Sequence, residues 1–355
     1  MRVLYFGTYE RHYPRNAQVI SSLRAAGVEV VEWHVPVWEG DEHKFGVGIG
    51  SAVKLATAEL RLLRKPRDDF DVMIVGYPGH FDLPRARRVA GSRPIVFNPL
   101  LSLYDSFVLD RGRWSQTSLP ARVLARVDRK AMQRSDLVIA DTEVHADFFA
   151  DLARIPRTKV EVCLLGAEES FFRPGWERRE EFHCLFFGKL IPLHGLETIL
   201  EAARLVPEIP FRIAGTGQRE DLLERALPAN VEWVRWVDHA EIPSELWSAG
   251  CSLGIFGTTD KAHRVIPNKA YEAIACATPL ITADTPASRE LFVDGESALL
   301  VPPGDPPALA AAVRRLAEDP ALASALSRGG LDVYHRFASE AVLGARWREL
   351  LEGVI

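Results

Sequence analysis

The stretch that decides the fold is RVLYFGTYERHYPRNAQVISSLRAAGVEVVEW, residues 2–33. Its first part, residues 2–6, is an apolar run typical of a buried strand, and Gly7 ends it. Residues 17–26 then place apolar side chains at helical spacing, and residues 28–33 form a second strand pattern. A strand, a loop, a helix and a strand in this order predict a parallel sheet.

The same alternation continues through the first half of the chain. Helical patterns, notably residues 121–133, separate further buried-strand runs at residues 72–75, 94–97, 137–140 and 159–163. Because strands and helices alternate throughout, we predict one doubly wound sheet in residues 1–172.

A polar stretch at residues 172–181 interrupts the pattern, and we place a linker there. The alternation then restarts at residue 183. It predicts strands at residues 183–188, 211–214, 231–234, 253–256, 279–282 and 298–301, with helices that include residues 198–205 and one after Pro267. The chain is therefore predicted to form two α/β domains, residues 1–172 and 183–335. The last helix, residues 336–355, is a candidate to cross back to the first domain.

Composition supports a large soluble protein and excludes several classes. Of the 355 residues, 47% are hydrophobic and 26% charged, which argues against disorder, collagen and coiled coils. The formal net charge is -5, but residues 1–172 hold 24 basic and 22 acidic side chains and the remainder 19 and 26. This small basic excess argues against a general nucleic-acid binder.

Cysteine usage and hydropathy indicate a cytoplasmic protein. The four cysteines form no Cys-x-x-Cys pair and stand beside apolar residues, which favours buried thiols over disulfides or metal ligands. The chain opens on a strand pattern instead of a signal peptide, and no apolar run reaches the roughly 18 residues that a membrane span needs.

Ligands of open parallel sheets bind beyond the carboxyl ends of strands, so the loops after strands are the places to look. Gly7 and Thr8 follow the first strand without a GxGxxG pattern. They form either an ordinary turn or a place where a bulky ligand approaches the backbone. In the second domain, Gly188 and Lys189 follow a strand, and His194 precedes a helix. Cations at a helix N-terminus favour phosphate, although a solvated loop lysine explains Lys189 equally well.

Two further segments of the second domain are candidates. Gly215 and Gly217 follow the strand at residues 211–214 and would allow close backbone approach. Glu272 lies in an otherwise apolar helix after Pro267, and a buried carboxylate must find hydrogen-bond donors. A ribose diol would supply two donors, and a salt-bridged structural glutamate is the alternative.

Together these stretches resemble the retaining, nucleotide-sugar-dependent glycosyltransferases of the GT-B fold, most closely glycosyltransferase family 4. Residues 267–279 and 288–305 carry the resemblance most strongly, and residues 188–195 and 165–174 fit it. It covers nearly the whole chain. It implies two Rossmann-like, doubly wound parallel-sheet domains facing a cleft, with the acceptor on the N-terminal domain and the donor on the C-terminal one.

The resemblance also implies roles for single residues. Lys189 and His194 occupy the positions of two cations that stabilise the leaving diphosphate without a divalent metal. A histidine in place of the second lysine is a departure, and it could act protonated or donate one hydrogen bond when neutral. Glu272 matches the acid that binds ribose. The family's first acid falls on Arg264, which leaves the donor sugar open.

Other positions follow from the same resemblance. Trp236 and Val237 would line the base pocket, with a core tryptophan as the alternative. Lys269 either contacts phosphate or lies on the helix surface. Asn98 and Asp105 are candidates near the donor sugar. The candidate catalytic residues are thus Lys189, His194 and Asp105. The candidate donor-binding residues are Gly7, Thr8, Gly188, Gly215, Gly217, Trp236, Val237, Asn268, Lys269 and Glu272.

Two predicted helical regions carry the basic excess of the first half. Residues 54–67 contain five basic residues against Glu59, and residues 111–134 contain seven against Asp128. Such faces either meet the inner surface of an anionic membrane or are ordinary solvated helix faces.

The leading hypothesis is a retaining transferase that moves a hexose from a nucleoside-diphosphate sugar to a glycan, lipid-linked or small-molecule acceptor. The donor is a co-substrate, and neither a cofactor nor a metal is expected. One alternative is a non-catalytic GT-B partner protein with a degenerate donor site, which Arg264 motivates. Another is a GT-B nucleotide-sugar epimerase, although no pattern of acid/base carboxylates and histidines supports it.

Overall fold

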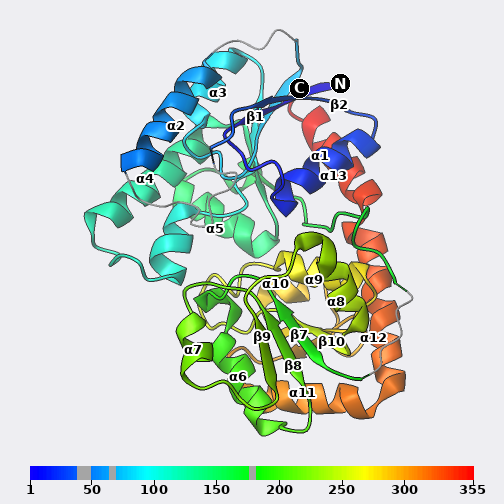
Figure 1. The fold of residues 1–355 in the computed structure, drawn as a ribbon. Helices are drawn as coiled ribbons and strands as arrows, with labels where there is room; N and C mark the ends of the chain where they lie inside the picture. Colours follow the sequence, from blue (N-terminus) through cyan, green and yellow to red (C-terminus); the bar gives the residue numbers. More distant parts are fainter. Residues whose placement is uncertain (38–48, 64–68, 176–180) are drawn as a thin grey trace. The chain divides into compact units, whose positions relative to one another are not determined.

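The computed structural model describes residues 1–37, 49–63, 69–175 and 181–355. The chain divides into two compact units (Figure 1). The first unit comprises residues 1–108, 112–164 and 340–355, and the second comprises residues 109–111 and 165–339. Each unit is built on one six-stranded sheet whose paired strands are all parallel. The predicted α/β class with two doubly wound sheets is confirmed.

The sheet of the first unit has the order β2-β1-β3-β4-β5-β6. Its strands are β1 (Arg2–Gly7), β2 (Glu29–His34), β3 (Val72–Val75), β4 (Ile95–Phe97), β5 (Leu137–Ala140) and β6 (Val160–Val162). Its α-helices are α1 (Pro14–Ala25), α2 (Ile49–Leu62), α3 (Leu83–Ala90), α4 (Leu119–Arg134), α5 (Glu143–Ala153) and α13 (Glu340–Glu352). A π-helical turn, η1 (Asp105–Asp110), and a 3-10 turn, η2 (Arg157–Lys159), complete the elements that begin in this unit.

The sheet of the second unit has the order β12-β11-β10-β7-β8-β9. Its strands are β7 (Cys184–Phe187), β8 (Phe211–Ala214), β9 (Val231–Val234), β10 (Cys251–Leu253), β11 (Leu280–Ala283) and β12 (Leu299–Val301). Its α-helices are α6 (Leu196–Leu205), α7 (Glu220–Arg225), α8 (Ile242–Ser248), α9 (Asn268–Ala275), α10 (Pro286–Arg289), α11 (Pro306–Glu318) and α12 (Pro320–Val333). Its short turns are η3 (Pro192–His194), η4 (His239–Glu241) and η5 (Tyr334–Ala338). The strand order reverses between β7 and β10, and ligands of such sheets bind beyond the carboxyl ends at that point.

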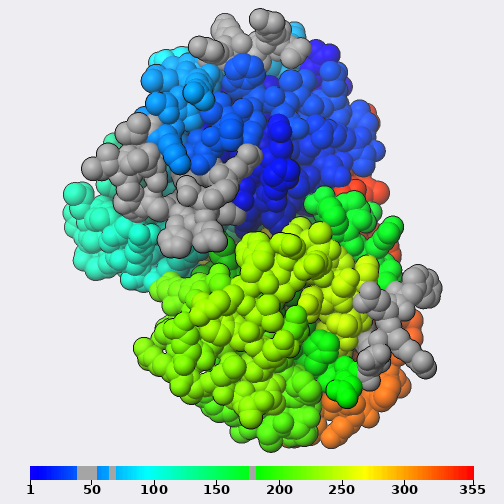
Figure 2. All heavy atoms as spheres, in the orientation of Figure 1, coloured from blue at the N-terminus to red at the C-terminus, as the bar shows by residue number. Residues whose placement is uncertain are grey.

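Hydrophobic burial on both faces explains why short apolar runs became strands. All four residues of β3 and of β7 are buried, as parallel strands covered by helices on both sides require. The second unit packs one large apolar core, and the first unit packs one on each face of its sheet. Figure 2 shows one face of the molecule with all heavy atoms drawn as spheres. The four cysteines are free and buried, as predicted.

The first division of the chain falls at residue 164, earlier than the predicted 172. The intervening segment packs onto the second unit. Phe172 is buried with its ring 5.2 Å from that of His239, and Trp247 Nε1 donates to Arg173 O at 2.8 Å. These contacts assign the segment to the second unit. Residues 176–180 of the predicted linker lie outside the described residues.

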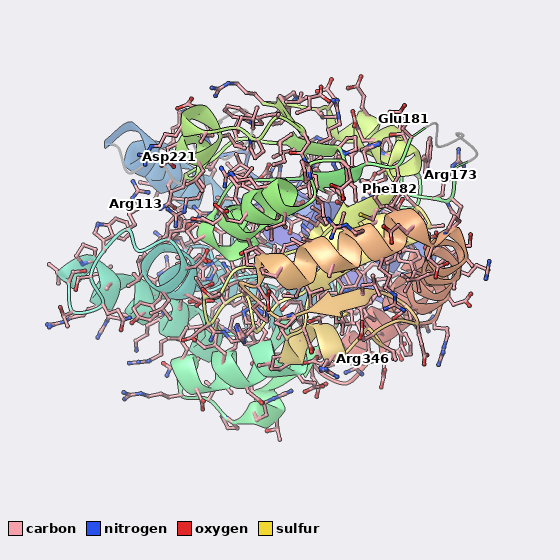
Figure 3. All side chains as sticks on the ribbon, turned by 90° about the horizontal axis from the view of Figure 1, so that it is seen from below. Arg113, Arg173, Glu181, Phe182, Asp221 and Arg346 are labelled. Atoms are coloured by element: carbon pink, nitrogen blue, oxygen red, sulfur yellow. The ribbon has the colours of Figure 1, made fainter. Side chains whose placement is uncertain are left out.

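The second division falls at residue 339, after the predicted 335, and helix α13 belongs to the first unit. Trp347 is fully buried in the core beside α1, and a side chain at Gly344 would collide with Ser22 O. Arg346, labelled in Figure 3, donates to Glu161 at 2.8 Å. The helix thus forms part of the first unit's core despite its distance along the sequence.

Strand β10 ends at Leu253, whereas the sequence predicts a strand at residues 253–256. Beyond Leu253 the backbone turns to the loop after β7. Phe256 N–H donates to His194 O at 3.1 Å, and Gly257 N–H donates to Leu193 O at 3.2 Å. These bonds join the two loops that follow the strands at the reversal point.

Candidate active site

The candidate donor site lies on the second unit, where the loop after β7 meets helix α9. Gly188 has φ 124°, a conformation that glycine adopts readily, and Lys189 beside it is exposed. A Cβ atom at Gly188 would lie 3.3 Å from Lys269 Nζ and 3.8 Å from His194 Cε1. The structure therefore brings together three of the predicted residues, Gly188, His194 and Lys269. Lys189, the fourth, follows Gly188 directly in the chain.

His194 ends the short turn η3 and is only 8% exposed. Its Nδ1 contacts Lys189 O, and because a carbonyl only accepts, Nδ1 carries a proton there. Burial lowers the pKa of His194 well below its usual value, and the charges of Lys269, Lys261 and Arg111 lower it further. Of the two predicted roles, the site without ligand therefore favours the neutral imidazole over the protonated one.

Lys269 lies in the first turn of α9 and is 5% exposed. The alternative of a helix-surface lysine is therefore wrong. Among the described residues, its Nζ has no hydrogen-bond partner, and it lies 3.6 Å from the centre of the Phe186 ring. Burial lowers the pKa of Lys269 well below its usual value, while the carboxyl of Glu272 acts in the opposite direction.

Glu272 lies on the same helix, three residues after Lys269, and is 5% exposed. Burial raises the pKa of Glu272 to about 7, and the positive charge of Lys269 opposes that rise. No ion pair within the described part of the chain includes Glu272, and the nearby Lys269 Nζ has no hydrogen-bond partner, so the alternative of a salt-bridged glutamate finds no support. A buried carboxylate near a sheet edge is chemically suited to accept hydrogen bonds from hydroxyl groups.

Asn268, the first residue of α9, is half-buried.

The two glycines after β8, Gly215 and Gly217, lie where the backbone of another loop comes too close for a side chain. A side chain at Gly215 would collide with Gly188 O, and one at Gly217 would lie 2.6 Å from Leu190 O. These glycines therefore allow the loop after β8 to approach the loop after β7, whether or not they also contact a ligand.

Trp236 and Val237 follow β9 on the same edge of the sheet. Trp236 is 74% exposed and its Nε1 donates to Asp238 at 3.0 Å, so the alternative of a core tryptophan is wrong. The tryptophan within β9, Trp233, is partly buried, and its Nε1 donates to Gly215 O at 2.9 Å. Sequence reasoning missed Trp233 because its partner is a backbone atom on a neighbouring strand. A large exposed ring at Trp236 is available for stacking.

In the first unit, Gly7 and Thr8 lie against Asp82. The backbone N–H of Thr8 donates to Asp82 Oδ2 at 2.7 Å, and a side chain at Gly7 would collide with the same carboxylate. Thr8 and Asp82 are buried. This close approach accounts for the glycine. Asp82 was not predicted, since nothing in the sequence links it to residues 74 positions earlier.

Asn98 and Asp105, the two candidates near the donor sugar, are fully buried. Asn98 Oδ1 accepts from Arg15 Nε at 3.1 Å, and Asp105 N–H donates to Ser102 Oγ at 2.9 Å. Neither side chain reaches solvent in this structure. Their contact with a donor stays a prediction that requires this part of the unit to rearrange.

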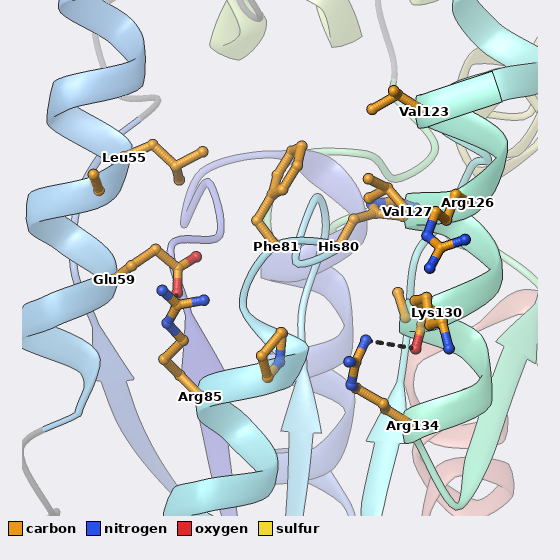
Figure 4. A pocket seen from close by; sticks show the side chains of 13 residues that line it. Leu55, Glu59, His80, Phe81, Arg85, Val123, Arg126, Val127, Lys130 and Arg134 are labelled. Carbon is orange, nitrogen blue, oxygen red and sulfur yellow. Dashed lines mark hydrogen bonds and ion pairs between the residues drawn. The ribbon is translucent and has the colours of Figure 1, made fainter. Parts of the chain in front are cut away.

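A cavity of about 470 Å³ lies in the first unit between α2, α3 and α4 (Figure 4). Leu55 and Glu59 line it from α2, and Arg126 and Lys130 from α4. Arg85 Nε of α3 lies 3.1 Å from Glu59 Oε2. Burial raises the pKa of Glu59 to about 9, and the nearby carboxyl of Asp82 raises it further. The cavity combines apolar walls with a cationic side on α4.

This cationic side belongs to the basic region predicted at residues 111–134. From the other basic region, Lys54 and Arg61 are exposed on α2, and Arg64, Lys65 and Arg67 lie outside the described residues. In the part of the chain that the structure describes, no cluster of three acidic, histidine or cysteine side chains is arranged to hold a metal ion. None of the described helices is both long enough and apolar enough to cross a membrane.

Comparisons with solved structures give the fold class. Sucrose-phosphate synthase from Thermosynechococcus elongatus superposes with a TM-score of 0.74 at 17% identity, covering 99% of both chains. Anabaena HepE in complex with UDP and glucose superposes with a TM-score of 0.71 at 16% identity, covering 99% of this chain and all of that one. Two doubly wound parallel-sheet units in one chain, similar to these structures, match the GT-B fold, and the predicted fold is confirmed.

Sequence comparisons give the family. Residues 181–319 match the family model of the glycosyl transferases group 1. The alpha-D-kanosaminyltransferase of Streptomyces kanamyceticus is 26% identical over 55% of this chain and 54% of that protein. The D-inositol 3-phosphate glycosyltransferase of Thermobispora bispora is 26% identical over 64% and 59%. The matched region thus spans little more than half the length of these relatives. Within the GT-B class, residues 181–319 of this chain are similar to the glycosyl transferases group 1, and the predicted resemblance to glycosyltransferases is confirmed.

Proposed function

We propose that this chain is a retaining glycosyltransferase that moves a hexose from a nucleoside-diphosphate sugar to a glycan, lipid-linked or small-molecule acceptor without a divalent metal. The observation that carries the proposal is the grouping of Lys189, Lys269 and Glu272 at the reversal point of the second sheet. Cationic groups there suit a diphosphate, and a buried carboxylate suits a ribose diol. The family match falls on the same unit.

The proposed chemistry requires no protein nucleophile. The bond between the anomeric carbon and the donor phosphate breaks, and a bond from that carbon to the acceptor oxygen forms on the same face. The departing phosphate takes the acceptor's proton. Lys189 stabilises the charge that develops on the diphosphate, because its positive charge lies next to the loop proposed to hold that group.

The choice of donors for a test follows from a structural neighbour. HepE has been determined with UDP-glucose, with UDP and glucose, and with UDP, so UDP-hexoses stand first, followed by GDP-, ADP- and dTDP-hexoses. On the acceptor side, the cavity between α2, α3 and α4 joins apolar walls to cationic side chains. This chemistry suits an acceptor that carries both an apolar part and an anionic group.

The test is donor turnover, measured as hydrolysis or transfer, with purified wild-type protein and two variants. Lys189→Ala and Glu272→Ala should each lower turnover at least 100-fold, since each removes a charged contact to the donor. Arg314→Ala is a matched control because this exposed arginine pairs with Glu208, which follows α6, and its removal should leave turnover unchanged. Full activity in both site variants would refute the assignment.

The two alternatives predict different results in the same assay. A non-catalytic partner protein with a degenerate donor site would bind no nucleoside diphosphate, or bind one without turnover. An epimerase would convert the nucleotide sugar itself with no release of the nucleoside diphosphate. Chromatography of the nucleotide products separates the three outcomes.

A further inference from the structure

His194 does not supply a positive charge in this site. Its Nδ1 proton is directed to Lys189 O, which leaves Nε2 of the neutral ring as an acceptor. The ring is buried and lies against Phe186, with the two centres 5.5 Å apart. Three neighbouring cations disfavour a further charge on it. A diphosphate in this loop therefore needs its buried cation from another residue.

Lys269 has the position for that role. Its Nζ would lie 3.3 Å from a Cβ atom at Gly188, and His194 Cε1 would lie 3.8 Å from the same point. The ammonium and the imidazole thus flank one glycine at the end of β7. A lysine that comes from α9, 75 positions later than His194, reaches the same place in space.

Lys269 also lacks a hydrogen-bond or ion-pair partner inside the described part of the unit. Within the described residues its Nζ donates no hydrogen bond and forms no ion pair, and the residue is 95% buried. The Phe186 ring at 3.6 Å offsets only part of the desolvation cost. A buried, unpaired ammonium is costly, and an anionic ligand would remove that cost.

Helix α9 adds a second attraction at the same end. Pro267 is the N-cap residue and makes no side-chain cap, so the first-turn N–H groups are not capped by a side chain. The positive end of the helix dipole therefore reinforces the ammonium. Glu272 lies three residues further on, close to the same helix face.

We propose that Lys269, in place of His194, is the buried cation that binds the diphosphate of the donor in this chain. The inference rests on the proposed function and deepens it. One helix then recognises both parts of the nucleotide, with Lys269 on the diphosphate and Glu272 on the ribose. His194 becomes a positioning residue that holds the backbone carbonyl of Lys189.

The test is calorimetry with UDP, GDP, ADP and dTDP against wild type and Lys269→Met, which keeps the length of the side chain and removes its charge. We expect affinity for the preferred diphosphate to fall about 10- to 100-fold, the usual effect of a lost charge-assisted hydrogen bond. Affinity for the matching nucleoside should stay within threefold. Lys159→Met, a change on the first unit, is the control and should bind like wild type.

A second variant places the cation back at the earlier position. In the double variant His194→Lys/Lys269→Met, affinity for the diphosphate should recover at least tenfold over Lys269→Met. The melting temperature of Lys269→Met should equal or exceed that of wild type, because the variant removes a buried unpaired charge. This combination separates a binding role from a structural one.

Two results would overturn the inference alone: Lys269→Met binding the diphosphate as tightly as wild type, or losing diphosphate and nucleoside affinity equally. A wild-type protein that binds none of the four diphosphates would overturn the proposed function as well. The two failures are therefore distinguishable in one set of titrations.

Discussion

At the scale of single residues, burial decides the chemistry of this site more than residue type does. His194, Lys269 and Glu272 are all titratable, and all three have a pKa moved towards the neutral form by desolvation. Without ligand the site thus carries less charge than its composition suggests. Binding of a diphosphate would supply the partner that favours the charged form of Lys269.

Glu272 makes stability depend on pH in a defined direction. Burial raises the pKa of Glu272 from the usual 4.5 to about 7, so folding favours the protonated carboxyl. Its contribution is therefore fully present below about pH 4.5 and is lost as the pH rises through 7. Relative to Glu272→Gln, the wild type should lose about 3 kcal/mol of unfolding free energy over this window.

Urea unfolding of both proteins at pH 5 and pH 8 measures this difference. Glu272→Gln is the matched control because it keeps the shape and cannot ionise. A stability difference between the two proteins that is the same at both pH values would contradict the raised pKa.

At the scale of elements, the C-terminal end of helix α9 places an alanine in a conformation that usually requires glycine. Thr278 N–H donates to Ala273 O at 2.9 Å and Ala277 N–H to Ile274 O at 3.1 Å, the pattern of a Schellman motif. Ala277 has φ 55°, the left-handed conformation in which glycine is usual. The helix therefore ends with the usual hydrogen bonds of this motif, but Ala277 holds a strained backbone conformation.

Ala277→Gly should therefore raise the free energy of unfolding by about 1 kcal/mol, since glycine adopts this conformation without a clash. Ala275→Gly, inside the same helix, should lower it by about 1 kcal/mol. Thermal or urea unfolding of the two variants gives the comparison. Destabilisation by Ala277→Gly would show that contacts of the half-buried methyl group outweigh the strain.

At the scale of the whole molecule, each unit depends on segments that are distant in the sequence. Helix α13 contributes Leu343, Trp347 and Leu351 to the core beside α1. The guanidinium of Arg15 lies 5.6 Å from the centre of the Trp347 ring. The first unit is therefore incomplete without residues 340–355.

Trp347→Ala should lower the free energy of unfolding of the first unit by about 3–5 kcal/mol, because it leaves a large cavity in a packed core. Trp236→Ala is the control, since that ring is 74% exposed and its removal should change stability by less than about 0.5 kcal/mol. Hydrogen exchange resolves the two units in one experiment. Equal protection of the first unit in wild type and Trp347→Ala would contradict this account.

Local sequence pattern was enough to predict most of the helices and strands and the loops that carry the candidate site. The strands at residues 72–75, 137–140 and 211–214 were predicted to the residue, because buried parallel strands are short apolar runs that end at glycine or polar residues. The strand predicted at residues 253–256 lies at residues 251–253 in the structure. Beyond residue 253 the backbone forms hydrogen bonds with another loop, and the order of apolar and polar side chains does not reveal such bonds.

The burial and the partners of individual side chains could not be predicted from the sequence pattern. Trp236 is exposed and Lys269 is buried, although a tryptophan or a lysine can occupy either environment in a folded protein. The partnership of Thr8 with Asp82 likewise joins positions 74 residues apart. Each of these facts depends on which loops the sheet brings together.

By itself the sequence determined the α/β class, the two doubly wound sheets and the loops that carry the candidate site, because these follow from local hydrophobic period and chain order. Only the tertiary structure decided which side chain is the buried cation and which histidine is neutral. The physical reason is that a residue's charge state depends on solvent exclusion and on neighbours from distant strands, and these exist only once the sheet has formed.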